Sequence, residues 1–206
     1  MKDLLIIGNG GHAKVIKDII NANGIYKVSG YLDDNIEKYF VKNDMIYDNL
    51  KNIKLYQENY HFIIAVGNNK IRADIFKKVD VPNEKFPVLI HPKAIVSETA
   101  NLGNGTVVMP GAIVNAESVI GRHSIINTCS VVEHECLIKD FTHISPGAVL
   151  TGNVSVDEYT QIGANATVIP NVRIGSNVLV GAGSTVISNT KNDVTLVGTP
   201  AKVIKE

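Results

Sequence analysis

The second half of the chain carries an aliphatic side chain at every sixth position. Counted in steps of six from Ile90 to Val186, seventeen consecutive positions hold Ile, Leu or Val. Four residues after these positions, from Ala94 to Ser184, the side chain is always Ala, Ser, Thr, Cys or Val. Neither an α-helix nor an ordinary β-strand has this period. A period of six is typical of a parallel β-helix, in which short strands form the three faces of a triangular prism.

In such a prism one coil takes about eighteen residues and lies about 4.8 Å from the next. The aliphatic residues are predicted to fill the interior, and the small residues four positions later to fit the corners. The prolines of the repeat all fall two residues after an aliphatic position, where a missing N–H costs least: Pro92, Pro110, Pro146 and Pro170. We predict about five coils between residues 90 and 188. A β-sandwich would not keep one register over so many repeats, and the period alone does not determine the handedness.

The first half of the chain has a different pattern. A buried-strand run, Leu4–Ile7, is followed by glycines and then by apolar residues at helical spacing from Val15 to Ile20. Further strands are predicted at Val28–Leu32 and at Phe62–Val66, the latter followed by a helix around residues 71–78. This order predicts a small parallel α/β domain over residues 1–85, with its ligands at the carboxyl ends of the strands. The β-helix then occupies residues 86–206.

The loop after the first strand, Gly8-Asn9-Gly10-Gly11-His12-Ala13, matches the G-x-G-x-x-A pattern of dinucleotide-binding folds. A domain of this length, however, accommodates only about one mononucleotide-binding half, and hydride transfer would leave the second half of the chain unexplained. We interpret the loop as a cradle for a phosphate or a nucleotide, because glycines let backbone N–H groups approach an anion at the start of a helix. A tight turn with glycines kept for packing stays open as an alternative.

Composition and charge exclude several classes of function. The chain has 20 basic and 20 acidic residues, so nothing indicates binding to nucleic acid or to an anionic membrane. The apolar stretch at the N-terminus is too short for a signal peptide, and no apolar run reaches the length of a membrane span. Cys129 and Cys136 show neither a disulfide framework nor metal-ligand spacing. We expect a cytoplasmic protein without a metal ion.

The uninterrupted repeat is followed by Val197-Gly198-Thr199-Pro200-Ala201-Lys202. This combination resembles the hexapeptide acyltransferases, whose β-helices are left-handed and whose subunits form trimers. In that family the G-x-P-A-K segment lies beside bound CoA. The resemblance therefore implies an acetyl-CoA-dependent enzyme, a left-handed parallel β-helix and a homotrimer.

The whole chain, with its glycine loop, its Asp-Asp pair and its Gly-Asn-Asn strand end, resembles the nucleotide-sugar N-acetyltransferases more narrowly. Members of that group act on UDP-4-amino-4,6-dideoxy sugars in bacillosamine synthesis. GDP-perosamine N-acetyltransferases and the sialic acid O-acetyltransferases are relatives. The resemblance implies that the nucleotide sugar is held by Gly10, Gly11, His12, Asp33, Asp34, Asn68 and Asn69.

Two histidines inside the repeat are candidates for catalysis. His134 lies two residues after an aliphatic position, beside a corner, and so projects outward, while His143 lies nine residues further on. Without a family context, two solvated surface histidines are the simpler interpretation. Acetyl transfer needs a base for the nucleophile and a donor for the oxyanion, and a His beside a carboxylate such as Glu135 supplies the first. Gly152 follows His134 by eighteen residues, so its backbone N–H is predicted on the same corner one coil later.

The resemblance assigns roles to these residues. It implies His134 as general base, Glu135 as its partner, His143 as a contact to acetyl-CoA and Asn127 near the substrate, and it adds acetyl-CoA contacts at Gly152, Gly163, Ala164, Ala182, Pro200 and Lys202. Cys129 and Cys136 are expected to be wall residues, so the acetyl group is expected to pass directly between the two substrates.

Three functions remain at this point. The leading hypothesis is acetyl-CoA-dependent N-acetylation of a nucleotide-activated amino sugar, feeding bacterial glycan assembly. The same helix and histidine would serve an O-acetyltransferase acting on sialic acid or a related sugar. A non-catalytic β-helix scaffold is the third possibility, although it has no reason to keep His134 and the G-x-P-A-K tail.

Overall fold

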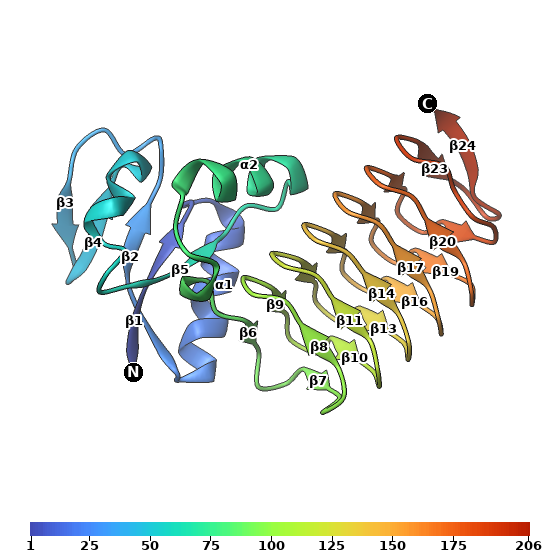
Figure 1. Ribbon diagram of the computed structural model, residues 1–206, viewed down its shortest axis with the longest axis horizontal. Helices are drawn as coiled ribbons and strands as arrows, with labels where there is room; N and C mark the ends of the chain where they lie inside the picture. Colours follow the sequence, from blue (N-terminus) through green and yellow to red (C-terminus); the bar gives the residue numbers. More distant parts are fainter.

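The computed structural model describes residues 1–206 and consists of an α/β part followed by a long β-helix (Figure 1). The α/β part holds one five-stranded sheet in the order β3-β4-β2-β1-β5, parallel except for β3. Its elements are β1 (Lys2–Ile7), α1 (Gly11–Asn23), β2 (Tyr26–Leu32), β3 (Phe40–Lys42), β4 (Met45–Asp48), the 3-10 helix η1 (Leu50–Leu55), β5 (His61–Ile64) and α2 (Asn69–Val79). A short 3-10 turn, η2 (Asn83–Lys85), leads out of it.

Alternate side chains of β1 point to opposite faces of this sheet. Leu4 and Ile6 pack with α1, whereas Leu5 and Ile7 pack with η1 and with Val79 of α2. The predicted strands and helices are all present. The hairpin of β3 and β4 was missed, because β3 is a three-residue, fully exposed edge strand without the alternation of a half-buried strand.

The β-helix is built from three parallel sheets, as the period predicts, and it is left-handed. We call them face 1, face 2 and face 3, in the order in which the chain visits them. Face 1 holds β6 (Leu89–Ile90), β9 (Val107–Val108), β12 (Ile125–Ile126), β15 (His143–Ile144), β18 (Gln161–Ile162) and β21 (Leu179–Val180). Face 2 holds β7 (Ile95–Val96), β10 (Ile113–Val114), β13 (Val131–Val132), β16 (Val149–Leu150), β19 (Thr167–Val168) and β22 (Thr185–Val186). Face 3 holds β8 (Asn101–Leu102), β11 (Val119–Ile120), β14 (Leu137–Ile138), β17 (Ser155–Val156) and β20 (Arg173–Ile174).

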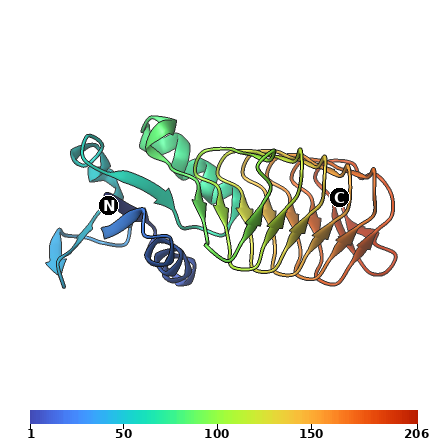
Figure 2. The same ribbon diagram turned by 90° about the horizontal axis from the view of Figure 1, so that it is seen from below.

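Each edge of the prism is named by the two faces that it joins, so the chain turns in order at edge 1–2, edge 2–3 and edge 3–1. After the last coil, β23 (Thr195–Val197) extends face 1, and β24 (Lys202–Lys205) pairs with it in the antiparallel direction. Figure 2 shows the coils stacked along one axis, with the α/β part at their first end.

The aliphatic ladder fills the prism as predicted. From Val108 to Val186 every sixth residue is at most 1 % exposed. Ile90, Val96 and Leu102 are only partly buried, because they form the first coil and no coil lies before them. The small residues four positions later are buried at the corners from Thr106 onward.

The turn itself lies one residue before the small position. Every sixth residue from Gly105 to Gly183 has a positive φ, between 51° and 74°. Gly and Asn tolerate this left-handed conformation, whereas other residues adopt it at a cost of about 1–2 kcal/mol. Among the residues that accept this cost are Glu135 at edge 2–3 and His123, Phe141 and Tyr159 at edge 3–1.

The α/β part covers the first coils of face 1 and part of edge 3–1. The apolar side of α1 packs on outward residues of the first coils, Leu89, Val107 and Ile125. The helix α2 reaches edge 3–1, where Phe76 packs on His123 at 4.3 Å between ring centroids. Because the two parts share this core, the boundary between residues 85 and 86 stays a prediction. No helix of the molecule is long and apolar enough to cross a membrane.

Candidate active site

His134 and Glu135 form an exposed pair at edge 2–3. His134 Nδ1 lies 2.9 Å from Glu135 Oε2, and each side chain is 58 % exposed. Two neighbouring residues rarely meet in this way, because successive side chains of an extended chain point apart. The left-handed φ of 59° at Glu135 turns its carboxylate back toward the imidazole. The carboxylate thus accepts a hydrogen bond from Nδ1–H, which leaves Nε2 as the nitrogen free to take a proton.

Gly152 lies directly under the His134 ring, one coil further on. The Asn153 N–H donates to the His134 carbonyl at 2.9 Å, which fixes the register of the two coils. A Cβ at Gly152 would lie 2.6 Å from His134 Nε2, so only glycine leaves room for the ring. The Gly152 N–H donates to no carbonyl or side chain within the chain. The predicted pairing of base and oxyanion donor is therefore geometrically available.

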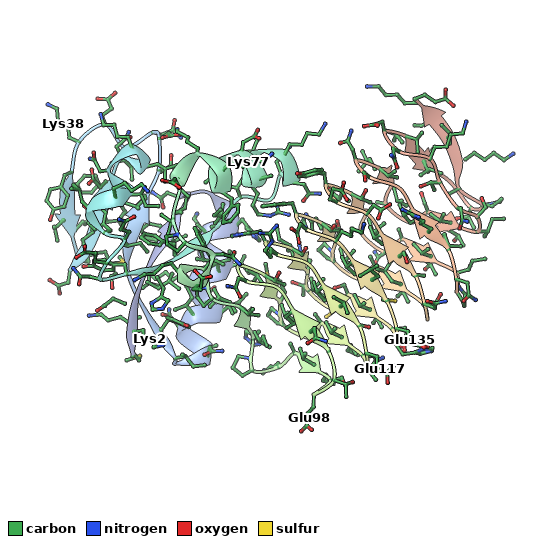
Figure 3. The ribbon with its side chains drawn as sticks, viewed as in Figure 1. Lys2, Lys38, Lys77, Glu98, Glu117 and Glu135 are labelled. Atoms are coloured by element: carbon green, nitrogen blue, oxygen red, sulfur yellow. The ribbon has the colours of Figure 1, made fainter.

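His143 lies on the other side of the prism. It projects outward from β15 on face 1, whereas His134 lies on edge 2–3, the edge opposite that face. In Figure 3 Glu135 is at the lower edge of the β-helix, whereas Lys77 is on α2 of the α/β part, in the upper half of the view. The structure therefore does not bring His134 and His143 together within one chain.

His143 belongs instead to the junction with the α/β part. Its Nε2 lies 2.9 Å from the Asn127 amide nitrogen, so the predicted substrate neighbour and the predicted acetyl-CoA contact touch each other. Burial, followed by the charge of Arg72 and the proximity of His12, lowers the pKa of His143 to about 4, against the opposing effect of a hydrogen bond to the Gly67 backbone. This imidazole is neutral at physiological pH and accepts a hydrogen bond from Asn127.

The glycine loop has the open geometry of a ligand cradle. The helix α1 begins at Gly11, and a Cβ at Gly10, Gly11 or Gly67 would meet nothing within 4 Å. Gly10 has an ordinary φ of −90°, so neither packing nor backbone conformation requires glycine there. This argues against the interpretation as a mere tight turn. A ligand that approaches the backbone at the carboxyl ends of β1 and β5 explains the glycines.

His12 carries a buried, unpaired nitrogen beside this loop. Its Nε2 is buried without any hydrogen-bond partner. Burial, and next the charge of Arg72, lower the pKa of His12 to about 4. An orphaned buried nitrogen is costly unless a ligand or a water satisfies it, which agrees with the predicted substrate role of His12.

Asp33 and Asp34 follow β2 at the same edge of the sheet. Asp33 accepts hydrogen bonds from the Asn9 N–H and the Asn35 N–H, both at 2.9 Å, and so ties the glycine loop to the end of β2. Asp34 forms an ion pair with Lys78 of α2 at 3.0 Å. Both carboxylates line a cavity of about 220 Å³ that reaches from Gly8 to Val66. Their role in binding a nucleotide stays a prediction.

Asn68 and Asn69 have structural tasks in addition to their predicted substrate role. The Asn68 side chain accepts the Ile71 N–H at 3.0 Å and caps α2. Asn69 donates to the Tyr159 and Thr160 carbonyls at 3.1 and 3.0 Å, and accepts a hydrogen bond from Arg72 at 2.7 Å. The side-chain N–H groups of Asn69 thus join the α/β part to the β-helix, while its Oδ1 accepts from Arg72 on the same helix. Sequence reasoning missed Arg72, which has the ordinary spacing of a helix residue.

The remaining predicted acetyl-CoA contacts gather at edge 1–2. Gly163 and Ala164 turn from β18, and Ala182 follows one coil later, with the Gly183 N–H donating to the Ala164 carbonyl at 2.8 Å. A Cβ at Gly163 would lie 2.6 Å from the Ala182 nitrogen. These small residues leave a flat strip of backbone.

The tail folds back beside that strip. Ala201, which stands between Pro200 and Lys202 in the chain, donates its N–H to the Thr185 carbonyl at 2.8 Å. Gly152, by contrast, lies on edge 2–3. The predicted cofactor set is thus divided between two edges of the prism.

The two cysteines differ. Cys136 is buried in a corner slot, as expected of a wall residue, but Cys129 is exposed at a left-handed corner of edge 1–2. The expectation that both are wall residues is wrong for Cys129, because its position is the turn and not the corner interior.

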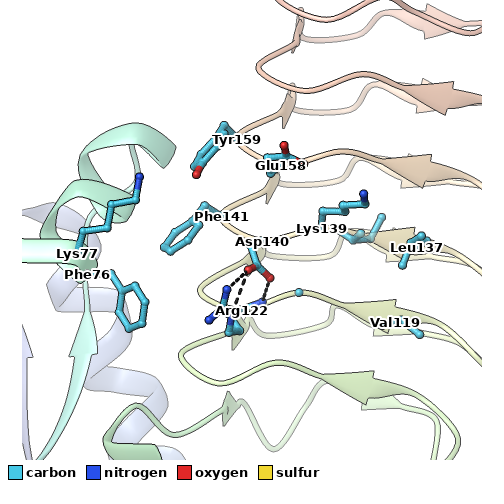
Figure 4. Close-up of a pocket in the computed structure, with 12 residues that line it drawn as sticks. Phe76, Lys77, Val119, Arg122, Leu137, Lys139, Asp140, Phe141, Glu158 and Tyr159 are labelled. Atoms are coloured by element: carbon cyan, nitrogen blue, oxygen red, sulfur yellow. Dashed lines mark hydrogen bonds and ion pairs between the residues drawn. The ribbon is translucent and has the colours of Figure 1, made fainter. Parts of the chain in front are cut away.

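A cavity of about 550 Å³ lies elsewhere (Figure 4). It is enclosed by α2 and face 3, with Phe76, the Arg122–Asp140 ion pair and Tyr159 in its walls. None of the residues predicted from the sequence lines it. We therefore place the site by the chemistry of its side chains and not by cavity size.

Two family models match the chain. Residues 3–79 match the PglD N-terminal domain, and residues 153–188 match the bacterial transferase hexapeptide repeat. Among curated proteins, UDP-N-acetylbacillosamine N-acetyltransferase of Bacillus subtilis is 42 % identical over 112 residues. That match spans 53 % of this chain and about half the length (52 %) of the relative.

Solved structures match over the full length. A histidine-to-asparagine variant of perosamine N-acetyltransferase from Caulobacter crescentus, in complex with CoA and GDP-perosamine, is 33 % identical with a TM-score of 0.91, covering 100 % of this chain and 98 % of that one. The acetyltransferase domain of PglB from Neisseria gonorrhoeae, in complex with acetyl coenzyme A, is 36 % identical with a TM-score of 0.88, covering 98 % and 99 %.

Proposed function

This chain belongs to the hexapeptide-repeat nucleotide-amino-sugar N-acetyltransferases, and on that premise we propose that it transfers the acetyl group of acetyl-CoA to the amino group of a nucleotide-activated amino sugar. A UDP-linked 4-amino-4,6-dideoxy sugar is the proposed substrate, supported by the likeness to the bacillosamine enzyme. The relatives named above are enzymes that acetylate nitrogen. They favour neither the O-acetyltransferase nor the scaffold hypothesis.

The observation that carries the proposal is the stacking of the His134 ring on Gly152. His134 Nε2, with Nδ1 held by Glu135, takes a proton from the sugar amine as the amine nitrogen attacks the thioester carbonyl. The Gly152 N–H donates to the oxyanion of the tetrahedral intermediate. When the C–S bond breaks, the imidazolium returns its proton to the sulfur of CoA. The products are the acetylated amine and free CoA, and His134 regains its starting state.

The α/β part would hold the nucleotide in one orientation. Asp33 and Asp34 end β2, two strands away from β5, and carboxylates accept hydrogen bonds from ribose or base but repel phosphates. The starts of α1 and α2 attract phosphates by their dipoles and free N–H groups. The base therefore points toward β2, and the sugar points toward Asn127 and His143 on face 1.

A second copy of the chain would supply the general base, His134. The nucleotide loop, Asn127 and the strip at edge 1–2 all lie on one side of the prism, and His134 lies on the opposite edge. The site is complete only where edge 2–3 of one chain meets face 1 and edge 1–2 of another. Such a contact joins two different surfaces, and repetition of it closes a ring.

We propose a homotrimer, the ring that the family resemblance implies. Face 2 lies between the two edges that would meet and would line the axis of the ring. Its outward residues are apolar at the first four coils and then threonine: Ile95, Ile113, Val131, Val149, Thr167 and Thr185. An apolar stripe of this kind agrees with a buried face between subunits. Two free cysteines agree with a cytoplasmic location, which we also propose.

The test is a transfer assay with purified protein. UDP-, GDP- and dTDP-linked amino sugars are each mixed with acetyl-CoA, and release of free thiol is recorded together with the mass of the sugar product. The expected result is an increase of 42 Da in the mass of the amino sugar, as for one acetyl group. A substrate that lacks the amine should show no increase. Transfer to a hydroxyl of an amine-free sugar, or no transfer to any of the three, would refute the proposal.

A further inference from the structure

Arg72 is a buried cation at the junction of the two parts of the chain. Its side chain is 1 % exposed, yet its guanidinium makes five hydrogen bonds. It donates to the carbonyls of Val66 and Gly67 at the end of β5, at 2.9 and 3.0 Å, and to the Asn69 side chain at 2.7 Å. On the β-helix it donates to the His123 carbonyl at 2.7 Å and the Thr142 carbonyl at 3.3 Å.

No carboxylate compensates this charge. All of the acceptors of Arg72 are neutral oxygens, and it takes part in no ion pair. Burial alone lowers the pKa of Arg72 to about 9, with no acidic group opposing the shift. An arginine stays protonated at neutral pH even so, and a buried charge without a counter-ion costs several kcal/mol. The other buried groups around it, His12, His123 and His143, are all neutral histidines.

The uncompensated charge lies at the edge where the nucleotide loop opens. Arg72 holds the carbonyls of the second and third residues after β5, and Gly67 leaves open space for a ligand. The N-termini of α1 and α2 flank the same strand end. The orphaned nitrogen of His12 is close enough to Arg72 for its pKa to respond to that charge. Three sources of positive potential therefore converge at this strand end, whereas the carboxylates of the same edge, Asp33 and Asp34, follow β2, two strands away from β5.

We propose that Arg72 is a positioning residue for the nucleotide substrate, whose diphosphate supplies the missing counter-charge while Arg72 holds the strand end that meets it. This inference rests on the proposed function. Arg72 has no free N–H to offer, so it acts on the diphosphate through its field and through the fixed carbonyl ends of β5. The same five hydrogen bonds fix the nucleotide loop relative to the β-helix, so anion binding and domain orientation depend on one side chain.

The test compares two variants that both lose the five N–H donors of the planar guanidinium but differ in charge. Arg72→Lys keeps the charge and Arg72→Gln removes it, and the affinities for UDP, GDP, uridine and guanosine are measured by calorimetry. We expect Arg72→Gln to weaken the binding of UDP and GDP by about tenfold, because it removes one unit charge that attracts the diphosphate. The two nucleosides should be affected much less, and Arg72→Lys should keep most of the diphosphate affinity. Equal losses for Lys and Gln, or equal losses for nucleosides and diphosphates, would show a purely structural role.

Arg122→Gln is the matched control. Arg122 lies at the same edge 3–1, but Asp140 already neutralises it at 2.6 Å. Its replacement should leave the diphosphate affinities unchanged. A loss equal to that of Arg72→Gln would mean that any positive charge at this edge has the same effect, and would overturn the special role of Arg72.

A measurement on the unaltered protein covers the case in which the Arg72 variants fail to fold. The imidazole pKa values of His12 and His143 are followed by NMR with and without saturating UDP or GDP. The charged group that faces both histidines is Arg72 on α2. His143 of β15 also faces the titratable His12 of α1. A diphosphate that offsets Arg72 should raise both pKa values, and unchanged values in the saturated complex would overturn the inference alone. If neither UDP nor GDP binds the unaltered protein, the proposed function falls and this inference with it.

Discussion

His134 and His143 lie on opposite sides of the β-helix although only nine residues separate them. Nine residues are half of an eighteen-residue coil, so the chain travels from edge 2–3 to the middle of face 1, directly across the prism. His134 is exposed beside Glu135, and His143 is half-buried against Asn127 and the α/β part. In the homotrimer proposed above, the two histidines belong to two half-sites, which meet where one chain contacts another.

Mixed oligomers test this division. Chains carrying His134→Ala and chains carrying His143→Ala are each expected to lose most activity, but co-refolded mixtures should regain it. In a random mixture about a quarter of the sites combine an intact edge 2–3 with an intact face 1. Activity of the mixture is measured against each parent. A mixture of the unaltered chain with the double variant serves as control. If each site were contained within one chain, the activity of the first mixture would not exceed the sum of the parents' activities.

Removal of the base should affect catalysis and not folding. Because His134 is exposed at an edge, His134→Ala should change the free energy of unfolding by no more than about 0.5 kcal/mol. The loss of a general base lowers kcat by about 10²- to 10⁴-fold. Glu135→Ala should lose less, since it removes only the partner of Nδ1. Steady-state kinetics with both substrates saturating decide the point: a His134→Ala enzyme with more than about a third of the original kcat would assign the base elsewhere, Glu133 being next.

Gly152→Ala tests the stacking of the two coils. The new Cβ would lie 2.6 Å from His134 Nε2, and Gly152 has no positive φ that would strain alanine. We expect the imidazole to be displaced, with kcat falling by about 10²-fold or more and little change in melting temperature. In the His134→Ala background the same substitution should have a much smaller effect. Additive losses in this double-mutant cycle would show that Gly152 acts independently of the ring.

Asp34→Ala should weaken the nucleotide sugar selectively. Asp34 lines the cavity at the end of β2, so its loss is expected to raise KM for the sugar nucleotide while KM for acetyl-CoA stays constant. Lys78→Ala breaks the same exposed ion pair, which is worth less than about 1 kcal/mol, without removing the carboxylate. Equal effects of the two substitutions on KM would assign the change to the ion pair and not to a substrate contact. Tight binding of NADH would instead revive the dinucleotide interpretation.

His123 should make stability depend on pH. Burial, and next the charges of Arg72 and Arg122, lower its pKa to about 3, and both of its ring nitrogens are buried without a partner. The folded state therefore binds fewer protons than the unfolded chain between pH 6.5 and about 3, so stability is complete above pH 6.5 and falls as the pH drops through that window. Urea titrations at pH 7.5, 5.5 and 4.5 measure the slope.

His123→Phe tests whether His123 causes the dependence of stability on pH. Phenylalanine keeps the stack on Phe141, which is 5.3 Å away between centroids, and removes two unsatisfied nitrogens. We expect greater stability at every pH, by about 1–3 kcal/mol at neutral pH, and a shallower dependence on pH. His12 and His143 remain as buried histidines with lowered pKa values, so part of the slope should persist. An unchanged slope would show that His123 does not contribute to it.

Much of the candidate site follows from counting residues. A coil of constant length makes position along the chain equivalent to position around the prism, so the eighteen residues between His134 and Gly152 predicted their contact correctly. The nine residues between His134 and His143 already implied opposite sides. The family resemblance grouped them at one site, which one chain alone does not form.

Other features had no signal in the sequence. Arg72 and Asn69 stand in a helix with ordinary spacing, and only the docking of α2 on edge 3–1 shows that their hydrogen bonds cross to the β-helix. Likewise, nothing in the sequence marks Glu135 as a left-handed turn residue, since glutamate gives no conformational hint of the kind that glycine or asparagine gives.

The sequence by itself determined the β-helix, its register and the α/β elements other than the β3–β4 hairpin and the 3-10 helices. These depend on local periodicity that each coil or strand repeats independently of distant residues. Only the tertiary structure decided which side of the prism carries the α/β part, and with it which residues share a half-site. That choice depends on the fit of α1 and α2 to face 1 and edge 3–1, through contacts such as Arg72 with His123 that join residues fifty-one positions apart. Pairings at such separations leave no period in the sequence, so they are visible only when the surfaces are packed together.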